Sequence, residues 1–91
     1  MTKQKKQENY DLESNLVNLS YIILHNDEVN TFDFVIDALI DICDHDEIQA
    51  EQCALITHYK GKCDVKKGEN TILENMKNLL LERGLSATIE K

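Results

Sequence analysis

The chain has 91 residues, a net charge of −7 and 42% hydrophobic residues, which is the size and composition of a single soluble globular domain. It contains no apolar run of about 18 residues, so we expect no membrane span. Residues 1–8 are polar and no apolar segment follows them, so we expect no signal peptide and a cytoplasmic protein. Three cysteines, an odd number, fit a reducing compartment and small packed side chains.

Acidic side chains are concentrated in the middle of the sequence. Between Lys6 and Lys60 there are twelve Asp and Glu residues and no Lys or Arg. Such a segment repels phosphate backbones, so we expect no binding to nucleic acid. It would attract a cation, an ammonium group or a basic partner. The alternative is a solvated acidic surface that keeps a small protein soluble.

The first elements follow from apolar patterning. Residues 1–17 are polar without sustained periodicity, and we interpret them as a flexible arm. Residues 18–25 (NLSYIILH) favour a buried strand, which the turn-forming residues after it end. A helix then begins at Asn30 or Thr31 as N-cap. Its apolar residues recur at helical spacing, with acids on the opposite side: Phe32, Val35, Ile36, Leu39, Ile40 and Cys43 against Asp33, Asp37 and Asp41.

Two more helices and two more strands complete the domain. Asp46 caps a helix over residues 47–58, and Gly61 stops it. We expect a strand over residues 62–67, a turn at Gly68, a helix over residues 71–83 that ends at Gly84, and a last strand over residues 86–90. The order β-α-α-β-α-β predicts an α+β fold over residues 18–91, with three helices packed on one side of a small antiparallel three-stranded sheet.

No arrangement of residues predicts an enzyme. The chain has no glycine-rich phosphate loop and no pair of cysteines spaced as in a zinc site. Cys43 and His45 would give only two metal ligands. Cys53 and His58 lie five residues apart on one helix and would point in different directions. We therefore expect no catalytic residue, no metal and no cofactor.

The end of the first strand is the better candidate for a binding site. Asn26 offers a carbonyl oxygen, and Asp27 and Glu28 offer carboxylate oxygens. Clustered acceptors of this kind suit an ammonium group, which brings three N–H donors and a positive charge. The alternative is a turn in which Asn and Asp bind local backbone amides.

His58 has two interpretations. It follows Ala50 and Ala54 at four-residue steps, so we expect it to point inward from the second helix as a packed core histidine. The alternative is a histidine that leans over a pocket and exchanges one hydrogen bond with a ligand.

Several segments together resemble the ClpS family of protease adaptors. The resemblance extends in one order over residues 18–91. It depends on an Asn-Asp-acid turn, a Phe-Val pair after it and a His-Tyr-x-Gly segment, within the sequences YIILHNDE (21–28), FVID (34–37), AEQ (50–52), HYKGK (58–62) and TIEK (88–91).

The resemblance implies a non-enzymatic adaptor. Members of this family bind N-degron proteins, whose first residue is a large hydrophobe such as Leu, Phe, Tyr or Trp. They deliver these clients to a ClpA- or ClpC-type unfoldase of the Clp protease, and residues 1–17 would engage the unfoldase. By the same resemblance Asn26, Asp27 and His58 would hold the client's α-amino group. Asn30 and Glu28 would lie near the client backbone, and the first side chain would enter a pocket formed by Phe32, Val35, Ala54, Thr57 and Leu85.

The sequence departs from the family pattern at the pocket. The family commonly has Thr-Pro-Met where this chain has Asn30-Thr31-Phe32, and a family Met is replaced by Ala54. We therefore expect a pocket whose preference differs from the usual set of first residues. The alternative function is a ClpS-like interaction domain that modulates a Clp unfoldase without capturing amino termini.

Overall fold

The computed structural model describes residues 19–91 of the chain, and the predicted arm at residues 1–17 lies outside them. It contains a three-stranded sheet and three helices in the predicted order, which confirms the α+β fold. The elements in chain order are β1 (Leu19–His25), α3 (Phe32–Cys43), α4 (Glu47–Lys60), β2 (Lys62–Glu69), α5 (Asn70–Glu82) and β3 (Ser86–Glu90).

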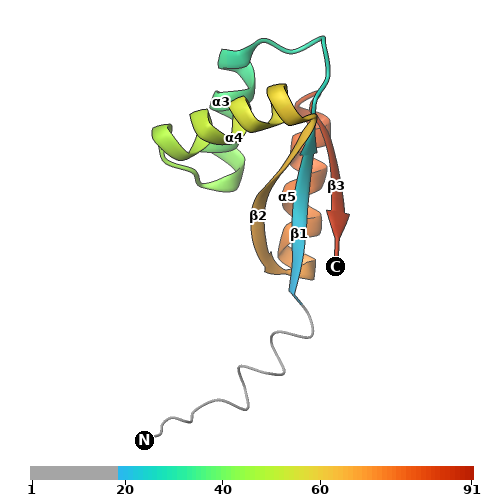
Figure 1. Cartoon of the computed structure of the whole chain (residues 1–91). Helices are drawn as coiled ribbons and strands as arrows, with labels where there is room; N and C mark the ends of the chain where they lie inside the picture. Colours follow the sequence, from blue (N-terminus) through green and yellow to red (C-terminus); the bar gives the residue numbers. More distant parts are fainter. Residues whose placement is uncertain (1–18) are drawn as a thin grey trace, which may run out of the picture.

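Strand β1 is the centre of the sheet and pairs antiparallel with β2 on one side and β3 on the other. Side chains of β1 alternate between the two faces, and Ile22 and Leu24 enter the core with 0% and 1% exposure. Helix α5 lies along the sheet, whereas α3 and α4 lie together at the end where β1 stops (Figure 1). The loop that follows β1 therefore lies at the junction of the sheet with this helix pair.

Short polar side chains and one glycine set the bounds of α3 and α4. The Thr31 hydroxyl accepts a hydrogen bond from the Phe34 amide at 3.1 Å. The Asp46 carboxylate accepts one from the Gln49 amide at 2.7 Å. Gly61 ends α4 with a φ of 94°, a left-handed conformation that glycine adopts without steric cost. These caps confirm the predicted helix starts and the predicted stop.

A β-bulge links the sheet to the loop between α3 and α4. Ile22 pairs with Lys66 and Ile23 with Asp64, so Val65 is an extra residue on β2. The carbonyl oxygen of Val65 lies 2.6 Å from Nε2 of the buried His45. Because a carbonyl can only accept, the His45 ring donates this bond and anchors the loop to the strand.

One detail of the predicted elements is wrong. Gly68 does not turn the chain but pairs with Ser20 inside the sheet. The turn is unnecessary because the Glu69 carboxylate accepts from the Ile72 amide at 3.3 Å and caps α5 directly after the strand. Ile48 and Ile72 are 73% and 55% exposed. They lie in the first turns of α4 and α5, on the sides that face solvent.

Candidate functional site

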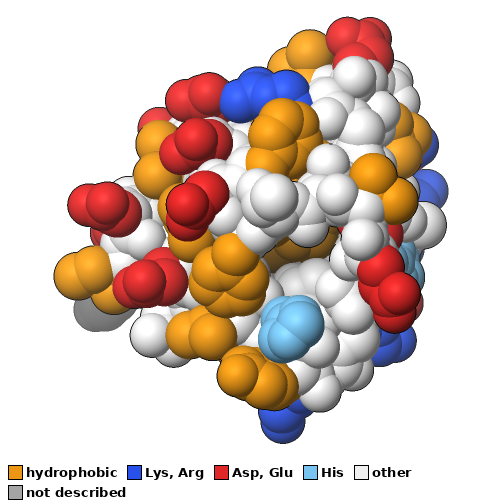
Figure 2. All heavy atoms as spheres, turned by 90° about the horizontal axis from the view of Figure 1, so that it is seen from above, with side chains coloured by type: hydrophobic (Ala, Val, Ile, Leu, Met, Phe, Trp, Pro, Cys, Tyr) orange, Lys and Arg blue, Asp and Glu red, His pale blue; other side chains and the backbone are white. Residues whose placement is uncertain are grey.

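A cavity of about 410 Å³ opens at the end of the sheet where β1 stops. Its walls come from the loop after β1, the first turns of α3, the second half of α4 and the turn between α5 and β3. All ten residues predicted from the sequence line it together with two further residues: Leu24, His25, Asn26, Asp27, Glu28, Asn30, Phe32, Val35, Ala54, Thr57, His58 and Leu85. Figure 2 shows the hollow with hydrophobic side chains inside it and a histidine at its rim.

The inner part of the cavity is apolar. Ala54 and Leu85 are 3% and 4% exposed, and Leu24 closes the sheet side. Ala54 is the smallest side chain of the inner wall, so α4 leaves space at this point. An apolar cavity of this size suits one large hydrophobic side chain.

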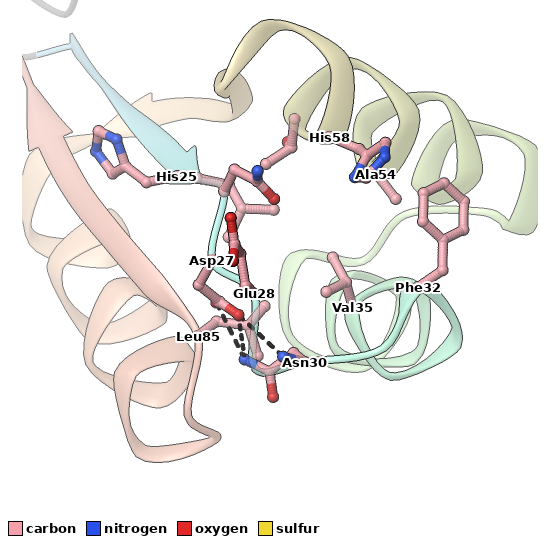
Figure 3. A pocket seen from close by; sticks show the side chains of 12 residues that line it. His25, Asp27, Glu28, Asn30, Phe32, Val35, Ala54, His58 and Leu85 are labelled. Atoms are coloured by element: carbon pink, nitrogen blue, oxygen red, sulfur yellow. Dashed lines mark hydrogen bonds between the residues drawn. The ribbon is translucent and has the colours of Figure 1, made fainter.

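Two rings flank the mouth. Phe32 at the start of α3 and His58 near the end of α4 face each other edge to face, with ring centroids 6.3 Å apart and an interplanar angle of 86° (Figure 3). Phe32 is 38% exposed, so its ring forms part of the rim and does not belong to the core. Both rings therefore border the mouth on the side of the helix pair.

The expectation that His58 packs inward is wrong. His58 is exposed, and Thr57 occupies the buried position with 4% exposure. At about 100° per residue, Thr57 lies roughly 20° from the direction of Ala50, whereas His58 lies roughly 80° from it. The buried face of α4 therefore passes through Ala50, Ala54 and Thr57, and the His58 ring is left at the mouth of the cavity.

The Asp27 carboxylate organises the loop after β1. Its Oδ1 accepts the backbone N–H groups of Val29 and Asn30, each at 2.9 Å. The turn interpretation is therefore correct for Asp27, and the carboxylate retains further acceptor capacity. Burial opposes ionisation, but the hydrogen bonds from Asn30 and Val29 outweigh it and hold the pKa of Asp27 below 3.8. The carboxylate is thus charged at neutral pH.

Acidic groups dominate the loop side of the mouth. Asp27 and Glu28 both belong to the loop, and acidic side chains lie on both sides of the hollow in Figure 2. The Arg83 guanidinium, in the turn after α5, is held by the Asp41 carboxylate at 2.6 Å. The arrangement can accept hydrogen bonds from a cationic donor at the mouth while it buries an apolar group inside.

Asn26 joins the loop to α4. Its backbone N–H donates to the Gly61 carbonyl at 2.9 Å, next to the end of the helix that carries His58. The glycine stop of α4 therefore also fixes the distance between the loop and the helix. The Asn26 side chain is exposed beside the cavity.

Leu24 and His25 also line the cavity, although neither was predicted from the sequence. Both are the last residues of β1, and a strand that ends at a binding turn contributes its final side chains to the same place. In Figure 3 the His25 ring lies apart from the other labelled side chains. Its Nε2 is 2.8 Å from the Thr88 hydroxyl oxygen on β3, so this histidine braces the sheet.

These features define a small α+β binding domain with a pocket at one end of its sheet, apolar inside and acidic at the mouth. Residues 17–88 match the family model described as ATP-dependent Clp protease adaptor protein ClpS. Because the match spans most of the chain, the protein belongs to the ClpS family, which consists of adaptors of the Clp protease and not of catalysts.

A solved structure shares the fold. The ClpS2 protein of Agrobacterium tumefaciens, in a structure with bound L-phenylalaninamide, matches with a TM-score of 0.70 and 24% identity. The match covers 80% of this chain and 95% of that one. Comparison with curated protein sequences gives no match. No helix within residues 19–91 is long and apolar enough to cross a membrane.

Proposed function

We propose that this adaptor binds the free α-amino group and the bulky hydrophobic first residue of N-degron proteins, and delivers them in the cytoplasm to a ClpA- or ClpC-type unfoldase. The observation that carries the proposal is the combination, in one cavity, of an apolar interior with an ionised carboxylate at the mouth. An N-terminal residue has the matching chemistry, because its ammonium group and its side chain are joined at one carbon atom.

The amine would be held by three groups from two elements. Asp27 supplies the negative charge, since its pKa lies below 3.8 and it is ionised at neutral pH. The Asn26 carbonyl oxygen and the His58 ring, when it is neutral, supply further acceptors. Hydrogen bonds between an ammonium and a carboxylate contribute about 1.5–3 kcal/mol each. Glu28 and Asn30 would lie beside the client's backbone.

The first side chain would enter the apolar interior. Burial of a large aliphatic or aromatic side chain stabilises a complex by about 1.5–3 kcal/mol. The wall would be formed by Phe32, Val35, Ala54, Thr57 and Leu85, all of which line the cavity. The ligand in the Agrobacterium tumefaciens structure, L-phenylalaninamide, combines a free amine with an aromatic ring and supports this assignment by its chemistry.

The test is binding of fluorescent peptides that begin with Phe or Leu, measured by anisotropy with the full chain. Each peptide is compared with its N-acetylated form, which keeps the side chain but removes the positive charge. We expect binding of the free peptide and loss of binding on acetylation. Equal affinity for both forms would contradict amine capture and favour an interaction domain that modulates an unfoldase in another way.

Delivery needs a separate measurement. A reporter protein that begins with Phe is incubated with the adaptor, a ClpA- or ClpC-type unfoldase and its peptidase. We expect the adaptor to accelerate degradation of this reporter and to leave unchanged a reporter that begins with Met. Two parallel assays, one for each unfoldase, identify the partner.

A further inference from the structure

The side chain of Asn30 joins two segments that are far apart in the sequence. Its Nδ2 lies 2.8 Å from the Gly84 carbonyl oxygen, and 3.1 Å and 3.3 Å from Oδ2 and Oδ1 of Asp27. An amide nitrogen has two hydrogens, so one can point at the carboxylate and the other at the turn between α5 and β3. The dashed lines in Figure 3 mark the bonds to Asp27.

Both partners of this amide belong to the cavity. The Asp27 carboxylate lies at its mouth, and Gly84 directly precedes Leu85, which is 4% exposed and forms part of the inner wall. Gly84 has a φ of 94°, and the Leu85 amide donates to the Leu80 carbonyl at 3.0 Å. The turn is therefore fixed to α5 on one side and to the Asn30 amide on the other.

We infer that Asn30 is a positioning residue, whose side-chain amide orients the Asp27 carboxylate toward the client's amine and sets its distance from the Leu85 wall. This inference rests on the proposed function and deepens it. The client's first residue binds through its ammonium group and its side chain at the same time. Affinity therefore depends on a fixed distance between the Asp27 carboxylate and the apolar wall at Leu85. Asn30 spans that separation with a single side chain.

Two substitutions separate this role from simple packing. Asn30→Ala removes the amide, and both the carboxylate and the turn lose a donor. Asn30→Asp keeps the shape but replaces the donors with a second carboxylate next to Asp27, which opposes ionisation. The matched control is Asn70→Ala. The Asn70 side-chain oxygen accepts from the Ser20 hydroxyl at 2.9 Å, at the opposite end of β1. The variant therefore loses one hydrogen bond far from the cavity.

The first measurement is the pKa of Asp27, followed by NMR through its own carboxyl carbon. His25, Glu28 and His58 line the same cavity and carry ionisable groups, so the Asp27 carbon must be observed directly in the unchanged chain and in each of the three variants. We expect Asn30→Asp to raise this pKa by about one unit or more, Asn30→Ala to raise it less, and Asn70→Ala to leave it unchanged. An Asp27 pKa that Asn30→Asp leaves unmoved would overturn the inference.

The second measurement is the Kd of a peptide that begins with Phe and carries a free amine. We expect both Asn30 variants to bind about tenfold more weakly and Asn70→Ala to bind as the unchanged chain does. Circular dichroism verifies that each variant is folded. If the unchanged chain binds and Asn30→Ala binds equally well, the inference fails and the proposed function stands. If the unchanged chain does not bind, the proposed function fails, and the Asp27 titration alone decides whether Asn30 holds the carboxylate.

Discussion

At the scale of a single residue, Asp27 accepts hydrogen bonds within the turn and, under the proposed function, would also bind the client's amine. Its Oδ1 accepts the amides of Val29 and Asn30, and its charge would meet the client's ammonium. Asp27→Asn keeps Oδ1 as the acceptor of the two turn amides, but it removes the charge and the Oδ2 acceptor of the Asn30 side chain. We expect client affinity to fall at least tenfold, because a charge-assisted bond is worth about 1.5–3 kcal/mol. The free energy of unfolding should fall less than in Asp27→Ala, because the turn amides keep their acceptor.

Peptide anisotropy and urea unfolding test this prediction on the same samples. Asp27→Ala is the comparison variant, because it removes the turn acceptor as well and should lower both affinity and stability. A Kd for Asp27→Asn equal to that of the unchanged chain would show that the charge does not contribute to binding.

Cys63 illustrates how burial of one thiol makes stability depend on pH. Burial, together with the neighbouring Cys53 thiol and Asp64, raises the pKa of Cys63 from 9.0 to about 12. Below pH 9 the thiol is neutral in both the folded and the unfolded chain. As the pH rises from 9 toward 12 only the unfolded chain ionises, so the folded state loses stability over this interval.

We therefore expect the urea midpoint to fall as the pH increases above 9, and to fall less in Cys63→Ala. Burial also raises the pKa of Cys53 and raises that of Cys43 to about 11, so both thiols contribute further slope, and Cys43→Ala is the matched comparison. The same high pKa values predict slow alkylation of Cys43 and Cys63 in the folded chain. A midpoint that changes with pH in the same way in Cys63→Ala as in the unchanged chain would contradict this account.

At the scale of elements, His45 connects the loop between α3 and α4 to the bulge of β2. Its ring is 4% exposed and donates to the Val65 carbonyl at 2.6 Å, while its Nδ1 is buried without a hydrogen-bond partner. The helix pair that forms one wall of the cavity is therefore tied to the sheet by this side chain. Without it, the Val65 carbonyl would be buried and unpaired.

We expect His45→Ala to lower the free energy of unfolding by about 2–3 kcal/mol, because it adds a small cavity to the lost hydrogen bond. Urea unfolding measures the change. His25→Ala is the control, since this half-buried histidine forms one side-chain bond, to Thr88 on the neighbouring strand, and should cost much less. Equal losses of unfolding free energy in the two variants would show that the His45–Val65 bond stabilises the fold no more than the His25–Thr88 bond does.

At the scale of the whole molecule, features that depend on neighbours in the sequence, such as helix caps, were predictable. Features that depend on packing between distant segments were not. Thr31 and Asp46 cap their helices as expected, because an N-cap depends only on residues within one turn. Gly68 was wrongly assigned to a turn, since pairing with β1 overrides local preference. The prediction for His58 was wrong because its side chain lies about 80° around the helix axis from the buried direction of Ala50. The bond from Asn30 to Gly84 joins residues 54 positions apart, and no local pattern encodes it.

The shape of the cavity depends on all these elements, and it leads to a prediction about the choice of client. Phe32 and His58 narrow the mouth, whereas Ala54 leaves space inside. The resemblance to the family implies clients that begin with Leu, Phe, Tyr or Trp. We expect peptides that differ only in their first residue to show a different order of affinity in this protein, because the stiff Phe32 ring borders the entrance and the Ala54 side chain on the inner wall is small. The usual ranking would refute this expectation.

Ala54→Met tests the inner wall directly. The added side chain fills the space that Ala54 leaves, so peptides that begin with Trp or Phe should lose about tenfold in affinity through overpacking, whereas a Leu peptide should lose less. Gln52→Met is the matched control, since it places the same side chain on an exposed position of α4 that does not line the cavity. Parallel anisotropy titrations of the three peptides measure the ratios. An equal loss for all three would mean that Ala54 sets the overall fit of the cavity and not its selectivity.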